Sequence, residues 1–171
     1  EGSKRMNEEI RGRFSGARVL VVGGAGFVGS NLVRAILESD VAQVIIVDNL
    51  LSSDASNIPD DLRVNFLHGS VNEPNILMGI PEDVDFAFHL ACFHGNQSSI
   101  ADPFADHENN TLTSLHLFNR LKELRNLKKV VYAAAACAVA EKTYDQPVAT
   151  TEDQPISLYH DSPYSISKII G

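Results

Sequence analysis

The sequence has few of the features that mark secreted, membrane or nucleic-acid-binding proteins. Only two cysteines occur, Cys92 and Cys137. Both lie in apolar stretches, so we expect buried, reduced thiols and a cytoplasmic protein. No apolar run approaches the ~20 residues of a membrane span, and residues 1–14 lack the apolar core of a signal peptide. The formal net charge of −8 argues against nucleic acid or an anionic membrane as a partner.

Apolar strand patterns and amphipathic helix patterns alternate along the 171 residues. We interpret residues 1–16 as a tail or surface turn and residues 17–171 as one domain. Strands are expected at 17–22, 44–47, 63–67, 84–91 and 129–135, and helices at 27–37, 73–78, 109–124 and from Pro163 onward. Buried strands joined by helices predict an α/β fold with a doubly wound parallel sheet.

A glycine-rich turn joins the first expected strand to the first expected helix. It reads GGAGFVG and fits both GxGxxG and GxxGxxG. Glycines at these positions allow a tight turn and a close approach of the backbone to a pyrophosphate, whose charge the amides of the helix N-terminus stabilise. The turn therefore predicts a dinucleotide site of the Rossmann type, with these contacts: Gly23, Gly26, Phe27, Val28 and Gly29.

An acid ends the second expected strand. Asp48 is placed to bind both ribose hydroxyls of a dinucleotide, with Asn49 beside it. A carboxylate there repels a 2′-phosphate, so we predict NAD rather than NADP. The alternative is a structural turn followed by an unrelated acid.

The last expected helix begins with the sequence YSISK, from Tyr164 to Lys168. The i, i+4 spacing puts Tyr164 and Lys168 on one face, so we expect Ser165 and Ser167 on the helix surface. A free phenol has a pKa of about 10. An adjacent ammonium and an oxidised nicotinamide lower that pKa and make the tyrosine a usable base. The alternative is two solvated helix residues.

With these motifs the chain resembles the extended short-chain dehydrogenase/reductase family over residues 17–171. Residues 23–32 and 47–50 are similar to its NAD fingerprint, residues 88–92 to its strand-four motif, residues 109–111 to its active-site asparagine segment and residues 162–168 to its catalytic motif. The resemblance implies further NAD contacts at Ser70, Val71, Leu90, Ala91, Cys92, Asn110, Tyr164 and Lys168.

Family members with such a fingerprint are commonly nucleotide-sugar epimerases, dehydratases or decarboxylases. The resemblance implies an NAD-dependent enzyme that transiently oxidises a hydroxyl of a nucleotide sugar, expected to be UDP-linked. Tyr164 would take the hydroxyl proton, and Lys168 would lower the pKa of the tyrosine and bind the nicotinamide ribose. Residues 94–99 and 140–144 resemble a branch from bacterial O-antigen gene clusters, which implies lipopolysaccharide biosynthesis. The family also dimerises through helices equivalent to 109–124 and the Tyr164 helix.

The sequence departs from the family pattern in three places. Ala135 stands where the family has a catalytic serine or threonine, so we take Cys137 as the first candidate to replace that hydroxyl, with simple packing as its alternative. Ser70 stands where an aspartate often binds adenine. The sequence ends at Gly171, three residues after the catalytic lysine, so we expect the substrate-binding half to be missing and this chain alone to be inactive.

Two other functions stay open at this stage. One is a non-catalytic NAD-binding sensor, which Ala135 favours, and the other is a reductase or steroid-type dehydrogenase of the same fold. His94 and Asn96 follow the fourth expected strand, where the family commonly contacts substrate. The histidines show no metal-ligand spacing with acids or cysteines, so we expect no metal.

Overall fold

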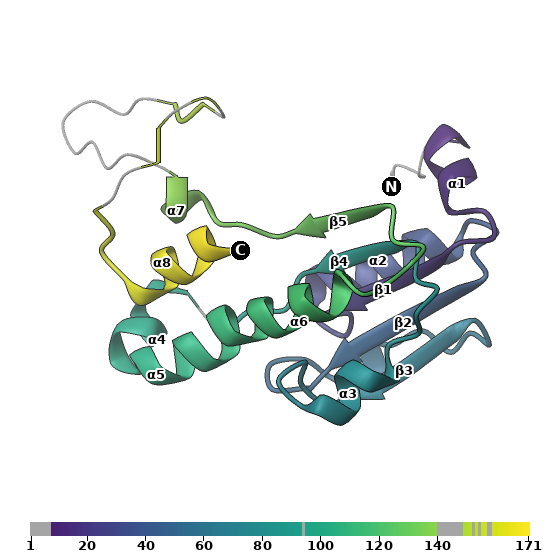
Figure 1. Ribbon diagram of the computed structural model, residues 1–171, viewed down its shortest axis with the longest axis horizontal. Coiled ribbons are helices and arrows are strands. Elements are labelled where there is room, and N and C mark those ends of the chain that lie inside the picture. The colour runs from purple at the N-terminus through teal and green to yellow at the C-terminus, as the bar shows by residue number, and fades with distance from the viewer. Residues whose placement is uncertain (1–7, 94, 140–148, 152, 154, 157–158) are drawn as a thin grey trace. The chain divides into compact units, whose positions relative to one another are not determined.

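Five parallel strands form a sheet in the order β3-β2-β1-β4-β5 (Figure 1). In chain order the strands are β1 (Arg18–Val22), β2 (Gln43–Asp48), β3 (Val64–His68), β4 (Phe86–His89) and β5 (Lys129–Tyr132). The central strands β1 and β2 are buried almost throughout, as expected for strands covered on both faces. The predicted doubly wound parallel sheet is therefore confirmed.

The computed structural model describes residues 8–93, 95–139, 149–151, 153, 155–156 and 159–171. These residues form two units. Unit 1 contains the described residues up to Ala91 together with His116–Tyr132, and unit 2 contains Cys92–Leu115 and the described residues from Ala133 onward. None of the described helices is long and apolar enough to span a membrane.

Two groups of helices cover the sheet of unit 1 on opposite faces. Alternate residues of a strand point to opposite sides. Val19 and Val21 of β1 therefore pack with helices α1 (Glu8–Phe14) and α2 (Phe27–Leu37). Leu20 and Val22 pack with α3 (Pro74–Gly79) and α6 (Thr113–Leu121) on the other face. A short 3₁₀ helix, η1 (Ala55–Asn57), lies within the expected loop at 50–61.

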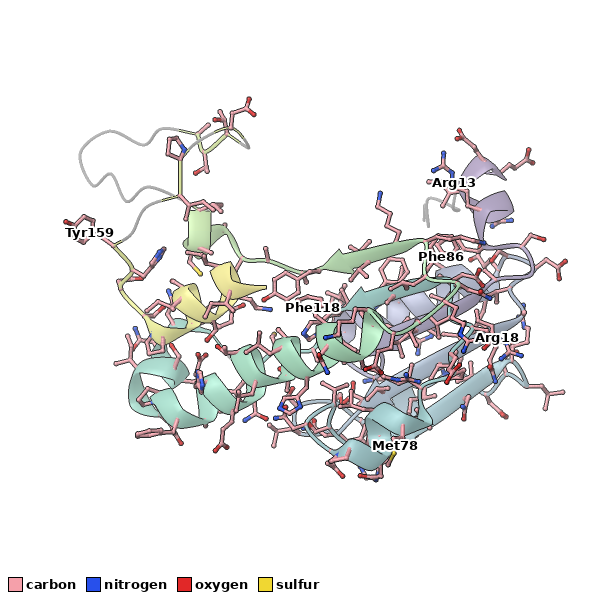
Figure 2. All side chains as sticks on the ribbon, in the orientation of Figure 1. Arg13, Arg18, Met78, Phe86, Phe118 and Tyr159 are labelled. Carbon is pink, nitrogen blue, oxygen red and sulfur yellow. The ribbon has the colours of Figure 1, made fainter. Side chains whose placement is uncertain are left out.

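Helix α1 occupies part of the segment that the sequence predicts as a tail or surface turn. Its last residue, Phe14, is buried, and its ring centroid lies 5.4 Å from that of Phe86 (labelled in Figure 2). One aromatic side chain thus attaches a charged segment to the core, and the four charged residues of α1 hide that signal in the sequence.

Strand β4 is shorter than the expected strand at 84–91. The backbone N–H groups of Leu90 and Ala91 both donate to the carbonyl of Val22, at 2.8 and 2.9 Å. Two successive donors on one carbonyl cannot continue a parallel ladder, so the strand ends after His89.

Unit 2 consists of short helices. They are α4 (Asn96–Ala101), α5 (Pro103–Asp106), the π-helical turn η2 (His107–Leu112), α7 (Ala136–Val139) and α8 (Pro163–Ile170). The expected helix at 109–124 thus starts earlier, at Pro103, where Asp102 caps α5 by accepting from the N–H of Ala105 at 3.0 Å. It also contains a π turn before α6, a feature that periodicity does not reveal.

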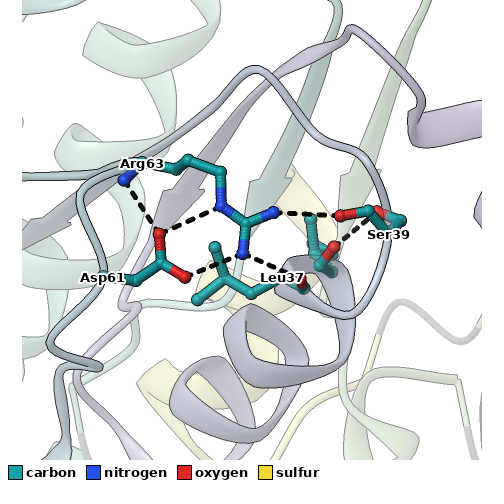
Figure 3. Close-up of polar contacts among 5 residues, drawn as sticks. Leu37, Ser39, Asp61 and Arg63 are labelled. Atoms are coloured by element: carbon teal, nitrogen blue, oxygen red, sulfur yellow. Dashed lines mark hydrogen bonds and ion pairs between the residues drawn. The ribbon is translucent and has the colours of Figure 1, made fainter.

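An arginine closes the end of α2 (Figure 3). The guanidinium of Arg63 donates to the carbonyls of Leu37 and Ser39, at 2.9 and 3.0 Å, and pairs with Asp61 at 2.7 Å. The last carbonyls of a helix have no partner within it, so the cation supplies donors where the helix lacks them. Hydrogen bonds from Arg63 lower the pKa of Asp61 to about 2.

We expect Arg63→Ala to lower the free energy of unfolding by about 1–3 kcal/mol, because two hydrogen bonds to carbonyls are lost. Urea denaturation measures the effect. The control is Arg13→Ala, since the Arg13 side chain is 70% exposed and makes one surface pair with Glu9; its expected effect is below about 0.5 kcal/mol.

The wild type and Arg63→Ala can also be compared in acid. The pKa of Asp61 is lowered in the folded state, so its contribution is complete above the usual value of 3.8 and is lost as the pH falls toward about 2. The stability difference between wild type and Arg63→Ala should therefore narrow over that range. A constant difference would contradict the assignment.

Candidate functional site

Two glycines in and after the turn that follows β1 have no space for a side chain. Gly23 has a φ of +85°, and a Cβ there would lie 2.5 Å from the backbone nitrogen of Ala91. A Cβ on Gly29 would lie 2.1 Å from the carbonyl oxygen of Gly23. At Gly26, in contrast, the nearest atom to an added Cβ is 3.4 Å away. The fold therefore requires Gly23 and Gly29 but not Gly26, whose missing side chain leaves the turn open to a ligand.

Helix α2 presents its N-terminus at this turn. Gly26 is the N-cap and makes no side-chain cap, and the amides of the first turn of a helix have no carbonyl partner within it. Such a terminus suits a pyrophosphate. Phe27 and Val28, predicted as dinucleotide contacts, are both exposed, Phe27 to 86%. They lie in the first turn, before the residues that pack on the sheet.

Asp48 is buried at the end of β2 and connects that strand to the glycine turn. One carboxylate oxygen accepts from the N–H of Ala25, and the other accepts from the N–H of Leu50 and the hydroxyl of Ser53, each at 2.9 Å. A carboxylate has about four acceptor positions, and these three bonds leave one of them for a ribose hydroxyl. Asn49 beside it is exposed.

The other predicted NAD contacts of unit 1 follow β3 and β4. Ser70 and Val71 come just after β3, and Leu90 and Ala91 just after β4. The hydroxyl of Ser70 accepts from the N–H of Asn72 at 3.2 Å, and Val71 is part of the core. Because the strands are parallel, these positions share the carboxyl edge of the sheet with Gly23 and Asp48, which is where such folds bind nucleotides. The donor set and the open turn fit a dinucleotide.

Unit 2 carries the tyrosine and the lysine on α8. The ammonium of Lys168 lies 5.9 Å from the ring centroid of Tyr164 and donates to the carbonyl of Ala133 at 3.0 Å. The Lys168 side chain is buried, with 4% exposure. Burial lowers its pKa, whereas the nearby Cys92, Asp106 and Cys137 raise it to a smaller extent.

The tyrosine end of α8 is held by α4. Ser162 caps α8 by accepting from the N–H of Ser165 at 3.2 Å and donates to the side-chain oxygen of Asn96 at 3.0 Å. The N–H of Tyr164 donates to the hydroxyl of Ser99 at 3.2 Å. Asn96, expected to contact substrate, therefore contributes to the cap.

The expectation that Ser165 and Ser167 lie on the helix surface is wrong. Both are buried, because α8 packs against η2 and α4 and its serines form hydrogen bonds there. Asn110 is also buried: its side-chain oxygen accepts from the N–H of Phe93 at 2.7 Å, and its amide donates to the carbonyl of Phe93 at 3.2 Å. This asparagine supports the segment before α4.

Both cysteines are free, but the expectation that both are buried is wrong. Cys92 is exposed, in an irregular segment between β4 and α4, and Cys137 is half-buried in α7. Ala135 lies after the end of β5, and its carbonyl accepts the N–H of Ala138 at 2.9 Å as α7 begins.

Two predicted features lie outside the described residues: His94 and the whole of residues 140–144. Within the part of the chain that the structure describes, no group of three or more His, Cys, Asp or Glu side chains is arranged to hold a metal ion.

The strand order, the glycine turn after β1 and the acid at the end of β2 together define a dinucleotide-binding Rossmann fold. The chain belongs to the NAD-dependent epimerase/dehydratase family, whose model matches residues 19–171. This match confirms the family resemblance, and with it the expectation that the chain belongs to a family of NAD-dependent enzymes.

Several relatives are similar over most of this chain. A UDP-glucose 4-epimerase from Halalkalibacterium halodurans is 33% identical over 132 residues, which are 76% of this chain and 36% of the relative. The Bordetella bronchiseptica enzyme WbmF, solved in complex with NAD⁺, is 49% identical, with a TM-score of 0.75 over 92% of this chain and 44% of its own. An epimerase from Methanothermobacter thermautotrophicus is 34% identical, with a TM-score of 0.85 over 95% of this chain and 47% of its own. The chain thus spans less than half the length of these relatives.

Cofactor choice should depend on Asp48. We expect NAD to bind at least about tenfold more tightly than NADP, because a buried carboxylate repels a 2′-phosphate; tenfold corresponds to about 1.4 kcal/mol. Asp48→Asn should reduce the preference, whereas the exposed Asp60→Asn should not. Calorimetric titration with both nucleotides measures it, and equal affinities in the wild type would contradict the role of Asp48.

Proposed function

We propose that this chain is the NAD-binding and catalytic part of a nucleotide-sugar epimerase or dehydratase that transiently oxidises a sugar hydroxyl. The observation that carries the proposal is the buried ammonium of Lys168 beside the ring of Tyr164 on α8. The family supports the reaction class. A UDP-linked substrate is supported by similarity to UDP-glucose 4-epimerases and to WbmF, which has also been solved with NAD⁺ and UDP.

In the proposed mechanism Tyr164 takes the proton from the substrate hydroxyl. A phenol has a pKa of about 10 and needs a cation nearby to act as a base at neutral pH. Lys168 supplies that cation, and its hydrogen bond to the carbonyl of Ala133 holds the ammonium in place. When bound through the glycine turn and Asp48, NAD supplies the reversible hydride acceptor. On return of the hydride, the tyrosine gives the proton back.

We propose that Cys137 replaces the hydroxyl that Ala135 lacks. Cys137 is half-buried, lies two residues further along in α7, and is close enough to Lys168 to affect its pKa. A thiol is a weak donor, so we expect a slower reaction than with a serine.

Ala135 also supports a second candidate function, a non-catalytic NAD sensor. A reductase or steroid-type dehydrogenase would release its cofactor, so NAD that copurifies tightly would count against it. The resemblance of residues 94–99 and 140–144 to the O-antigen branch supports a role in lipopolysaccharide biosynthesis, and the two free thiols support a cytoplasmic location.

In the whole protein, Tyr164→Phe should reduce turnover of a UDP-sugar by at least about 10²-fold, because general-base catalysis of this kind contributes 10²–10⁴-fold. NAD should still bind, because the glycine turn and Asp48 are intact. Product formation is followed by chromatography and NAD binding by calorimetry. Tyr159→Phe is the matched control, since the side chain of Tyr159 is 94% exposed (Figure 2).

The same assay examines the missing hydroxyl. Ala135→Ser should raise turnover and Cys137→Ala should lower it, the latter by less than the 10²–10³-fold that follows loss of a strong donor. Full activity of Tyr164→Phe would refute the tyrosine mechanism. If neither the wild type nor Ala135→Ser turns over any nucleotide sugar, the sensor function replaces the enzymatic one.

We also propose that the whole protein is a homodimer that packs through α5, α6 and α8. Exposed apolar side chains on these helices support this, among them Phe104, Leu115 and Ile166. Light scattering should give the mass of two chains, and Leu115→Asp should give that of one. Met78→Asp, on the exposed side of α3, should leave the dimer intact. A wild-type monomer at high concentration would contradict the proposal.

A further inference from the structure

Unit 2 contains a buried carboxylate that the proposed chemistry does not use. Asp106 ends α5 with 1% of its surface exposed. One carboxylate oxygen accepts from the side-chain amide of Asn110 at 2.7 Å, and the other accepts from the hydroxyl of Ser167. A charge this deeply buried is stable only when paired or hydrogen-bonded, and both neighbours are donors.

One of these partners, Ser167, belongs to α8, the helix that carries Tyr164 and Lys168. Ser167 immediately precedes Lys168 on α8, and its hydroxyl also accepts from that of Thr111 at 3.1 Å. Asp106 and Thr111 thus hold the lysine end of α8 against α5 and η2, at the opposite end of the helix from the contacts made by α4. A helix fixed at both ends keeps Tyr164 and Lys168 at a defined height and rotation.

The other partner, Asn110, extends the hydrogen-bond network to the segment before α4. Asn110 donates to both Asp106 and the carbonyl of Phe93, and accepts from the N–H of Phe93. The carboxylate therefore connects three segments: α8, the π turn η2 and the chain at Phe93. Cys92, which is among the groups that raise the pKa of Lys168, is the residue before Phe93.

The carboxylate also affects the lysine through its charge. Burial disfavours the ammonium form of Lys168 and lowers its pKa, whereas Cys92, Asp106 and Cys137 act in the opposite direction. The ammonium also lies 5.9 Å from the ring centroid of Tyr164 and donates to the carbonyl of Ala133. Among the described residues that raise this pKa, Asp106 is the one carboxylate. A nearby charge has more effect where water is excluded.

We propose that Asp106 is a positioning residue for the Tyr164–Lys168 pair: it holds the lysine end of α8 through Ser167, and its buried charge acts on the ammonium of Lys168. This inference rests on the proposed function for its effect on turnover, but its effect on Lys168 is independent of any substrate.

The test is Asp106→Asn in the whole protein, because an asparagine keeps the size and one acceptor but removes the charge. NMR titration of the ¹⁵N-labelled lysine ammonium should show Lys168 losing its proton at lower pH than in the wild type. Because the mechanism needs the ammonium, the alkaline limb of the kcat/KM profile should move to lower pH as well. Turnover at the optimum should fall on the order of 10- to 100-fold, as for a displaced catalytic group.

Two further variants separate position from charge. Ser167→Ala removes the hydrogen bond but keeps the carboxylate, so turnover should fall while the Lys168 titration stays in place. Asp102→Asn removes an exposed carboxylate four residues before Asp106 and should change neither the titration nor the pH profile. Circular dichroism establishes that each variant is folded.

An unchanged Lys168 titration in folded Asp106→Asn would overturn the inference, even if the enzyme is active. If Asp106→Asn does not fold, Asp106→Glu and Ser167→Ala decide. Wild-type turnover in Ser167→Ala would overturn the inference. So would an Asp106→Glu variant in which Lys168 loses its proton at lower pH than in the wild type, although the carboxylate is retained. If the wild type turns over no nucleotide sugar, the proposed function fails, and the titration alone still decides the role of Asp106.

Discussion

The close packing of backbone against backbone at the end of β1 is the constraint on which unit 1 depends. Gly23 lies against the chain at Ala91, and Gly29 against the carbonyl of Gly23, with no room for a side chain at either position. This contact sets the distance between β1, the start of α2 and the segment after β4. Asp48 then fixes the turn by accepting from the N–H of Ala25. A ligand at this edge therefore meets a backbone that packing and hydrogen bonds already hold in place.

The parts of the fold that the sequence predicts are those in which one residue pattern has one structural meaning. Strands β1 and β2 are short apolar runs rich in β-branched residues, and β1 leads into a glycine turn, as is typical of strands covered on both faces. The glycine turn was predictable for the same reason. Helices α1 and α4 were missed because their sequences are polar, and Phe14, which attaches α1 to the core, gives no periodic signal.

The candidate site could be predicted where its residues are close in sequence, and not where they meet only in space. Tyr164 and Lys168 are four residues apart, and helix geometry brings them together. Asp106 is 61 residues from Ser167, and a polar residue in a helix is ordinarily expected to face solvent. That expectation failed for Ser165 and Ser167 as well, because α8 is enclosed by other polar helices and its buried side is made of hydroxyl groups. Cys92 failed in the opposite direction: an apolar sequence context did not make it buried.

The proposed chemistry makes two opposing demands on Lys168. An ammonium acts most strongly on a neighbouring phenol when water is excluded from both, but exclusion of water also favours the neutral amine. A buried lysine with no acceptor or opposite charge nearby would therefore favour the neutral amine, which cannot act on the phenol as a cation. The hydrogen bond to the carbonyl of Ala133 holds the ammonium, and the charge of Asp106 opposes the effect of burial, which remains the larger of the two. The carboxylate in turn has donors on both oxygens, so its own burial does not leave an unpaired charge. The π turn η2 contributes two donors to this hydrogen-bond network. Asn110 donates to Asp106, and Thr111 donates to Ser167.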